Sequence, residues 1–455
     1  MSADIIAERL RRLGDRTAIV WRDEPVSYAD LLEAIAVARD LLTAEGVRAG
    51  SVVVVLGDFT PNAIATELAL FELGCVVVPL RSQDETRHDE LCELSEAEWV
   101  VTAGGDGSTV VGRTGARAQS PLYRDLAEAG RPGLVLFSSG TSGVPKAALH
   151  DADQLLSKFE RPARPVSMLA FLLFDHVGGI NTMLHSLLNG GCLVTVPSLT
   201  PDSVGAAIEE HRVALLPTSP TFLNMFLLSR VDERYDLSSL QVVSYGSEPM
   251  PELTLKTMRT RMPEVKLHQT YGMTEIGIPV SKSRSSDSLW MKFIGDNCEY
   301  RVRDGMLEVR TATAMLGYLN APSPFTPDGW MVTGDEVDVD GEWFHVRSRR
   351  SELINVGGQK VFPVEVESVL EEMEGVEEAV VSGEPSPLTG HLVCATVRLA
   401  EDEPLPELRQ RLRRHCRERL PRYMVPQKVV ISEKLLQSER HKKQRTPPAE
   451  TRPSE

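Results

Sequence analysis

The chain has 455 residues, 42% of them hydrophobic and 25% charged, and a formal net charge of −16 at pH 7. This length exceeds what one hydrophobic core supports, so two or more domains are expected. The composition is that of an ordinary globular protein. The electrostatic field of the net negative charge argues against nucleic acid or an anionic membrane as partners.

The cysteines and the apolar runs exclude several further classes of protein. The cysteines form no C-x-x-C pair, which argues against zinc and against a disulfide framework. The residues after Met1 are polar and charged, unlike a signal peptide, and no apolar run approaches the roughly 20 residues of a membrane span. We therefore expect a protein of the reducing cytoplasm. The six cysteines are Cys75, Cys92, Cys192, Cys298, Cys394 and Cys416.

Helix-like and strand-like segments alternate from the start of the chain. Ser27 is expected to cap a helix over residues 28–45, and Pro61 to open another over residues 61–74. Fully apolar strands separated by helices predict a mostly parallel sheet covered on both faces. Strands are expected over residues 51–57, 75–80, 98–103, 167–174, 192–197, 213–219 and 240–246.

The residue composition and the hydrophobic pattern change along the chain. Residues 104–132, rich in Gly, Ser and Arg, are expected to form an irregular surface connection. From about residue 290, alternating residues and the Asp304-Gly305 turn predict an antiparallel subdomain. After residue 350 we expect a helix opened by Pro363, two strands and a basic helix over residues 405–419.

These patterns together predict an α/β protein with two domains. The large N-terminal domain is expected over residues 1–350 and combines mostly parallel sheets with a β subdomain. A smaller α+β domain is expected over residues 351–445. The polar, Pro-rich tail over residues 446–455 is expected to be disordered.

One loop carries the strongest chemical signal. An apolar run, residues 134–137, leads straight into the sequence SSGTSGVPK at residues 138–146. Hydroxyls and exposed backbone N–H groups suit a polyphosphate, and a lysine adds positive charge. It is not a Walker loop, because Pro145 precedes the lysine and Ala147 follows it. The loop therefore predicts phosphate binding, with a polar surface connection as the alternative.

The loop resembles the phosphate loop of the adenylate-forming enzymes, which include acyl- and aryl-CoA synthetases, peptide adenylation domains and luciferases. Four more family signatures follow in the family's order. They are GSEPM at 246–250, YGMTE at 271–275, DGWMVTGD at 328–335 and SRRSELINVGGQKVFPVEVE at 348–367. The resemblance, which is nearest to acyl- and aryl-CoA ligases, implies a large adenylation domain followed by a mobile C-terminal lid.

The resemblance also implies a two-step reaction. A carboxylate attacks the α-phosphorus of ATP, pyrophosphate leaves, and a thiol then displaces AMP from the acyl-AMP. Such phosphoryl chemistry depends on positioning and charge neutralisation. The implied substrates and cofactors are ATP, Mg²⁺, a small organic acid, and CoA or a carrier-protein phosphopantetheine.

The resemblance assigns the nucleotide contacts residue by residue. Thr274 would touch the α-phosphate, and Glu275 would coordinate Mg²⁺ together with Thr141. Asp335 would accept hydrogen bonds from the ribose hydroxyls, and Arg349 would face the ribose and phosphates. The β- and γ-phosphates would be held by Ser138, Ser139, Gly140, Thr141, Gly143 and Lys146. The adenine would be lined by Gly246, Ser247, Glu248, Tyr271 and Gly272.

Two neighbouring residues, Lys442 and Lys443, are candidates for the family's lid lysine. Aligning LQSERHKKQR, residues 436–445, with the family's P-x-T-x-x-G-K pattern puts Lys442 on the catalytic lysine. His441 then stands where the family has Gly, which leaves open whether Lys442 or Lys443 points inward. A basic tail without a catalytic role is the alternative. The lid's hinge is expected at Ser351.

The acid pocket is expected near FDHVGGIN, residues 174–181. His176 matches the gate position of acyl- and aryl-CoA synthetases and is a catalytic candidate, although a structural histidine is the alternative. Asp175 resembles the residue with which peptide adenylation domains hold an amino group. The expected lining is Phe174, Asp175, His176, Thr218 and Gly246.

Three functions therefore remain open at this stage. The first is an ATP-dependent carboxylate–CoA ligase, and the second loads a carrier protein, for which the basic helix over residues 405–419 would provide a docking face. A variant would adenylate a non-carboxylic oxyacid such as nitrite. A binding protein without turnover belongs to another class, and the chain is expected to be a monomer or homodimer.

Overall fold

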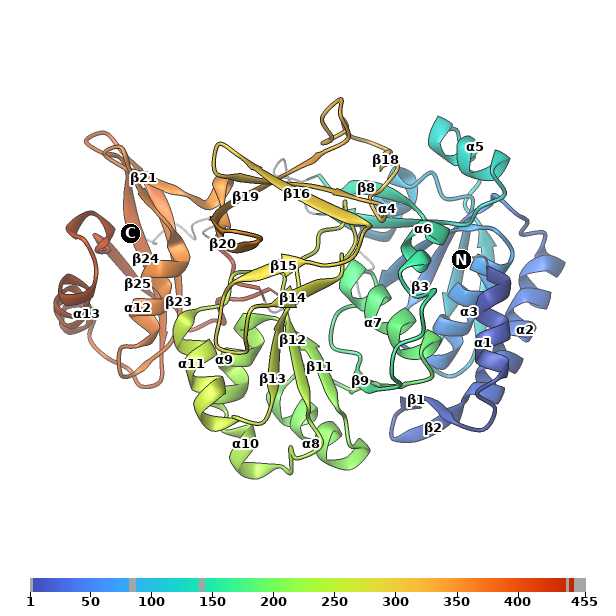
Figure 1. Cartoon of the computed structure of the whole chain (residues 1–455), viewed down its shortest axis with the longest axis horizontal. Helices are drawn as coiled ribbons and strands as arrows, with labels where there is room; N and C mark the ends of the chain where they lie inside the picture. The colour runs from blue at the N-terminus through green and yellow to red at the C-terminus, as the bar shows by residue number, and fades with distance from the viewer. Residues whose placement is uncertain (1–2, 82–86, 139–143, 439–441, 446–455) are drawn as a thin grey trace, which may run out of the picture.

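The computed structural model describes residues 3–81, 87–138, 144–438 and 442–445. Four sheets with their surrounding helices make up this part of the chain (Figure 1). None of the helices in these ranges combines the length and the apolar character needed to cross a membrane.

The first sheet has seven strands in the order β18-β8-β7-β4-β3-β5-β6, and its central four strands are parallel. Val53 and Val55 of β3 belong to one core cluster, whereas Val52 and Val54 belong to another, so both faces of the sheet are covered. The strands are β3 (Val52–Gly57), β4 (Val76–Arg81), β5 (Trp99–Ala103), β6 (Thr109–Arg113), β7 (Gly133–Ser138), β8 (Lys146–Asp151) and β18 (Gly317–Tyr318). Its helices are α1 (Ala3–Arg11), α2 (Tyr28–Glu45), α3 (Pro61–Glu72), α4 (His88–Leu94), α5 (Pro121–Glu128) and α6 (Ala152–Ser157).

The second sheet also has seven strands, in the order β13-β12-β11-β9-β10-β1-β2, and all neighbours except the β1–β2 hairpin are parallel. Its strands are β1 (Thr17–Trp21), β2 (Glu24–Ser27), β9 (Ser167–Leu169), β10 (Cys192–Val194), β11 (Leu215–Thr218), β12 (Val242–Tyr245) and β13 (Lys266–Gln269). Its helices are α7 (Val177–Leu188), α8 (Pro201–His211), α9 (Pro220–Leu228), α10 (Val231–Arg234) and α11 (Glu252–Arg261).

An antiparallel sheet follows in the order β14-β15-β20-β19-β17-β16. Asp304 and Gly305 form the turn between β16 and β17, both with positive φ, as a tight hairpin requires. Its strands are β14 (Ser281–Ser283), β15 (Met291–Phe293), β16 (Cys298–Arg303), β17 (Met306–Thr311), β19 (Met331–Asp340) and β20 (Trp343–Arg349).

The last sheet and its helices form what we call the C-terminal unit, residues 354–445. It lies beside α9 and α11, at the opposite end of the molecule from α1 and α2 (Figure 1). Lys360 forms an ion pair with Glu336 of β19 at 2.7 Å, and Arg347 of β20 forms one with Glu365, so charged contacts join the unit to the rest of the chain. Its elements are β21 (Ile354–Val356), β22 (Gln359–Val361), α12 (Pro363–Glu371), β23 (Val376–Ser386), β24 (Gly390–Leu399), α13 (Leu405–Arg419), the 3-10 helix η3 (Arg422–Met424) and β25 (Lys428–Ile431).

Most predicted elements are present, and two expectations were wrong. Ser27 caps α2 with a capping box, and Pro61 and Pro363 open α3 and α12 as expected. Residues 104–132 are not irregular, because they contain β6 and α5. The apolar run over residues 167–174 is a strand only as far as Leu169, because the chain then leaves the sheet and turns toward α7.

Candidate nucleotide site

Two of the signature segments begin where parallel strands end. The strand β12 ends at Tyr245, directly before Gly246, and β13 ends at Gln269, just before Tyr271. Parallel strands bring their carboxyl ends to one edge of a sheet, which is where ligands bind in open α/β sheets. The 246–250 and 271–275 segments are therefore neighbours at this edge.

The two segments pack so closely that glycine is required. A Cβ on Gly246 would lie 2.7 Å from the carbonyl oxygen of Thr270, and one on Gly272 would lie 2.7 Å from that of Gly277. Ser247 has φ +71°, a left-handed backbone conformation that is unusual for a residue other than glycine. Such strain persists where the surrounding structure enforces it and is common at ligand sites.

Asp335 is held at the same place by two partners. The Tyr271 hydroxyl donates to its carboxylate at 2.5 Å, and the Arg349 Nε lies 3.3 Å from the other carboxylate oxygen. Asp335 and Arg349 are cross-strand partners on β19 and β20, which fixes their spacing. Burial raises the pKa of Asp335, and Arg349 and the Tyr271 hydroxyl oppose that rise.

These residues line one pocket, which we call the nucleoside pocket. The sequence did not single out Gln269, whose buried Oε1 has no hydrogen-bond partner among the described residues. A buried acceptor left unpaired is suited to a donor from a ligand. The signal available was its place at the last residue of a strand, two residues before Tyr271. The lining is Ser247, Glu248, Pro249, Gln269, Thr270, Tyr271, Gly272, Met273, Asp335, Val346, Arg349, Glu352 and Arg445.

Glu275 lies at the mouth of the hairpin that carries the phosphate loop. Its Oε1 accepts hydrogen bonds from the Ser138 hydroxyl at 3.2 Å and the Tyr318 hydroxyl at 2.5 Å. The Lys146 ammonium lies 5.2 Å from the Tyr318 ring centroid, and Ser138 and Lys146 are cross-strand partners. Carboxylate and hydroxyl oxygens are ligands that Mg²⁺ prefers, so this donor set fits the expected metal.

Four predicted phosphate ligands, Ser139, Gly140, Thr141 and Gly143, lie outside the described residues, so their roles stay predictions. The described residues resume at Val144, two residues before Lys146, which begins β8.

His150 contacts the backbone of the 271–275 segment. It is fully buried, and its Nε2 donates to the carbonyl oxygen of Thr274 at 2.6 Å, which fixes the backbone next to Glu275. Burial lowers the pKa of His150 to about 4. The imidazole is therefore neutral in the folded chain.

The His150→Gln variant is expected to unfold with a weaker pH dependence than the wild type. Below its ordinary pKa of 6.5, the unfolded chain binds a proton at His150 that the folded chain does not. Stability is therefore lost as pH falls from about 6.5 to about 4, by about 3 kcal/mol for a buried group. Urea midpoints at pH 7, 5.5 and 4 measure the difference, and parallel curves for both proteins would contradict it.

The C-terminal segment reaches the nucleoside pocket through Arg445 and its neighbour Lys443. The backbone N–H of Lys443 donates to Glu248 at 3.3 Å, so this segment touches the 246–250 turn. The Lys443 ammonium is paired with Glu371 at 2.6 Å and with Glu367 at 3.3 Å, both on α12. Among the described residues this segment forms a single β-bridge, at Lys443, so the direction of the Lys442 side chain stays a prediction. His441 lies outside the described residues.

Comparisons with known proteins agree with this geometry. The family profile of AMP-binding enzymes matches residues 6–319, and that of the AMP-binding enzyme C-terminal domain matches residues 365–443. The chain belongs to the AMP-binding enzyme family. The predicted adenylate-forming family, α/β fold and AMP-forming acid–thiol ligase class are thereby confirmed.

Individual relatives of this AMP-binding enzyme are similar along most of its length. A 2-succinylbenzoate–CoA ligase of Bacillus cereus is 28% identical over 463 residues, with 92% of each chain covered. An indoleacetate–CoA ligase of Aromatoleum aromaticum is also 28% identical, with 92% of each covered. The fold is similar to that of the anthranilate CoA ligase AuaEII, with a TM-score of 0.81, 20% identity and 98% of each chain covered.

The residues predicted for the acid pocket of this AMP-binding enzyme occupy different environments. Phe174 is fully buried in the core, edge-to-face with Phe59 at 5.5 Å. His176 is the N-cap of α7, where its Nδ1 accepts from the Gly178 N–H at 3.2 Å. Thr218 ends β11 and its buried hydroxyl has no hydrogen-bond partner among the described residues. Thr218 is thus the member whose buried hydroxyl could meet a ligand, and the acid-pocket roles of Phe174 and His176 stay predictions.

The expected hinge lies between two sheets. Ser351 is exposed in the 3-10 helix η2 (Arg350–Glu352), which directly follows β20 and precedes β21. The antiparallel sheet therefore ends, and the sheet of the C-terminal unit begins, within a few residues of Ser351.

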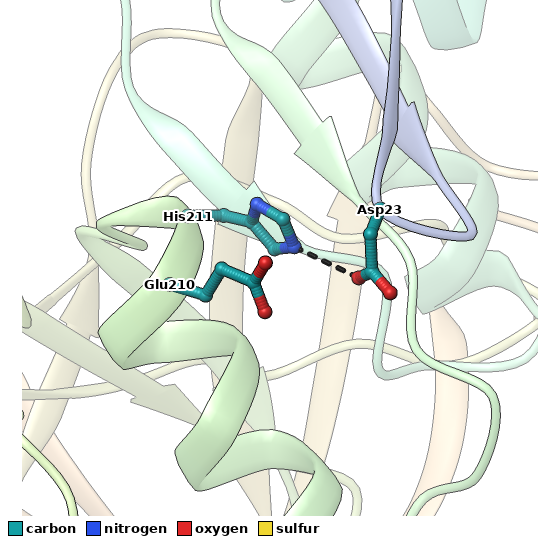
Figure 2. Close-up of side chains that lie close together, drawn as sticks. All are labelled: Asp23, Glu210 and His211. Carbon is teal, nitrogen blue, oxygen red and sulfur yellow. Dashed lines mark hydrogen bonds and ion pairs between the residues drawn. The ribbon is translucent and has the colours of Figure 1, made fainter.

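A separate group of side chains lies away from the nucleoside pocket of this AMP-binding enzyme. Figure 2 shows His211, at the end of α8, facing Asp23 in the β1–β2 turn, with Glu210 beside them. The His211 Nε2 lies 3.1 Å from Asp23, and a histidine is favoured at a helix C-terminus. Both carboxylates are exposed, so the group is explained as a surface contact in which the hydrogen bond between His211 and Asp23 joins α8 to the hairpin.

Proposed function

We propose that this enzyme is an ATP-dependent carboxylate–CoA ligase that forms an acyl-AMP and then transfers the acyl group to the thiol of CoA. The observation that carries the proposal is the nucleoside pocket, in which Asp335 is held by Tyr271 and Arg349 beside the 246–250 turn. The similarity to CoA ligases over 92% of the chain supports a thiol as the acceptor.

The pocket residues have distinct tasks in this proposal. The two carboxylate oxygens of Asp335 would accept from the vicinal hydroxyls of the ribose. Gln269 would accept from the exocyclic amine of the adenine, since its Oε1 is buried and unpaired among the described residues. Arg349 would stabilise the carboxylate of Asp335 and face the phosphates. Together these contacts would orient the α-phosphorus for in-line attack.

The phosphate side would be organised around Glu275. Mg²⁺ would be held by Glu275, with Ser138 nearby, and would neutralise charge on the triphosphate. The Tyr318 hydroxyl would orient the carboxylate, because burial and the neighbouring Glu275 raise its pKa and keep it a donor. Lys146 would add a positive charge on the same side.

Lys442 would supply the cation for the first step. Because the Lys443 ammonium is paired with two glutamates on α12, Lys442 is the lysine that we expect to face the nucleotide. A lysine at this place would neutralise the developing charge between the attacking carboxylate and the leaving pyrophosphate. Ser351 would be the hinge on which the C-terminal unit moves before thiol transfer.

The enzyme is expected to release pyrophosphate with ATP and an organic acid, and to form a thioester only when CoA is added. The assay is a pyrophosphate-release screen over aryl, short-, medium- and long-chain acids, with and without CoA. Thr218 favours a small or medium acid that carries a polar group, because its buried hydroxyl has no other partner among the described residues. An absence of pyrophosphate with every acid would contradict the proposal.

The screen should contain two further arms for the alternatives. Nitrite tests whether the oxyacid is a carboxylic acid at all. An acidic carrier protein tests the alternative acceptor, a carrier-protein thiol. One surface feature favours this acceptor, because four exposed arginines line a groove between α13 and β25. None of them pairs with a carboxylate among the described residues, so they are available to an acidic partner. They are Arg409, Arg413, Arg414 and Arg417.

A further inference from the structure

The segment that carries Lys442 is fixed to α12 by buried charges. The Lys443 ammonium lies 2.6 Å from Glu371 and 3.3 Å from Glu367. The Arg445 guanidinium donates to the two oxygens of Glu367, both at 2.9 Å. The side chains of Glu367 and Glu371 are 1% and 5% exposed, and that of Lys443 is 10% exposed, so water scarcely screens these pairs.

The same segment also contacts two other parts of the chain. Arg445 is paired with Glu352 of η2 at 2.7 Å, one residue from the expected hinge. The Lys443 N–H donates to Glu248, whose carboxylate also accepts from the Thr221 N–H at 2.9 Å at the start of α9. The segment is thus bound to α12 by the side chains of Lys443 and Arg445, and to the nucleoside pocket by the Lys443 backbone and the Arg445 side chain.

The charge state of this cluster is consistent with a structural task for Lys443. Burial alone would lower the pKa of Lys443, but the carboxylates of Glu367 and Glu371 outweigh it and hold the pKa above its ordinary value. Lys443 therefore stays protonated, and its charge is neutralised inside the C-terminal unit. Its ammonium is not available to a phosphate.

The backbone around Lys442 is locally extended. The Ser438 N–H donates to the Lys442 carbonyl oxygen at 2.8 Å, and Gln437 and Lys443 form an antiparallel bridge. Lys443 and Arg445 both contact carboxylates of α12, and the alternation of side chains along an extended backbone would put Lys442 and Gln444 on the opposite face.

We propose that Lys443 is a positioning residue, whose ion pairs with Glu371 and Glu367 fix the segment 442–445 on α12 so that Lys442 is presented by a rigid element. The inference rests on the proposed function and concerns its first step only. The pairs with Glu371 and Glu367 lie wholly within the C-terminal unit, so they travel with it when it turns. The contact between Lys443 N–H and Glu248 joins the unit to the rest of the chain and must break.

The test compares Lys443→Met and Lys443→Arg in the full-length enzyme, with Lys434→Met as the matched control. Lys434 is an exposed lysine of the same C-terminal unit. Two half-reactions are measured separately: pyrophosphate exchange with ATP and an accepted acid, and thioester formation from chemically prepared acyl-AMP and CoA. Hydrogen–deuterium exchange of the peptide over residues 436–445 reports the anchoring directly.

Lys443→Met is expected to slow pyrophosphate exchange about 100-fold, because a displacement of about 1 Å far from the chemistry has effects of that size. Thioester formation from acyl-AMP should stay within about twofold, since the task proposed for Lys442 belongs to the first step alone. The 436–445 peptide should exchange faster, Lys443→Arg should restore much of the first rate, and Lys434→Met should match the wild type.

Equal losses in both half-reactions would overturn the inference, since they would indicate a general folding defect. Unchanged pyrophosphate exchange and unchanged deuterium uptake would overturn it as well. If the wild type forms no acyl-AMP with any acid, the proposed function fails, but deuterium uptake still decides whether Lys443 anchors the segment.

Discussion

Replacing Lys442 by Ala is expected to lower the rate of acyl-AMP formation by about 10²- to 10³-fold, the usual effect of removing one group that stabilises transition-state charge. The affinity for ATP should change little, because in the proposed function the base and ribose are bound by other residues of the nucleoside pocket, among them Asp335. Pyrophosphate exchange measures the first quantity, and equilibrium binding of ATP measures the second.

The comparison with Lys443 makes this prediction specific. Lys442→Arg keeps the charge but changes the shape of the donor, so a partial recovery of pyrophosphate exchange is expected. Unchanged exchange in Lys442→Ala would show that another cation performs the task. Because Lys443 is neutralised by Glu367 and Glu371, we would not expect it to be that cation.

Replacing Asp335 by Asn is expected to raise the KM for ATP by about 10- to 100-fold, as for the loss of charged hydrogen bonds. The amide is isosteric, but it offers one acceptor in place of two and leaves Arg349 without a counter-charge. The Tyr271 hydroxyl would also lose a charged acceptor. Steady-state kinetics at saturating acid, with ATP varied, measure the effect.

The matched control is Asp340→Asn on the same strand. Asp340 is paired with Arg284 at 2.7 Å at the surface, and its side chain is 63% exposed. Surface pairs of this kind contribute little, so its KM for ATP should equal that of the wild type. Equal KM values for Asp335→Asn and the wild type would remove Asp335 from the ribose site.

The sequence was informative wherever a local rule decides the structure. Ser27 caps a helix because its hydroxyl meets the N–H of Asp30, three residues on. Asp304-Gly305 forms a hairpin turn because its backbone conformation suits those residue types. The signature segments were recognised by short patterns for the same reason. The prediction for residues 104–132 was wrong because the polar composition hid β6 and α5, whose partners are elsewhere in the chain.

Short patterns in the sequence therefore predicted the order of helices and strands and the family. They also identified Asp335, Glu275 and Tyr271 as candidate nucleotide contacts. The tertiary structure alone decided which lysine of the 442–443 pair is neutralised and brought Gln269 to the pocket. The physical reason is that the pairing of Lys443 with Glu367 and Glu371 joins residues more than seventy positions apart. Such contacts depend on how α12 packs against the final segment. No sequence pattern within either segment predicts that the two will meet.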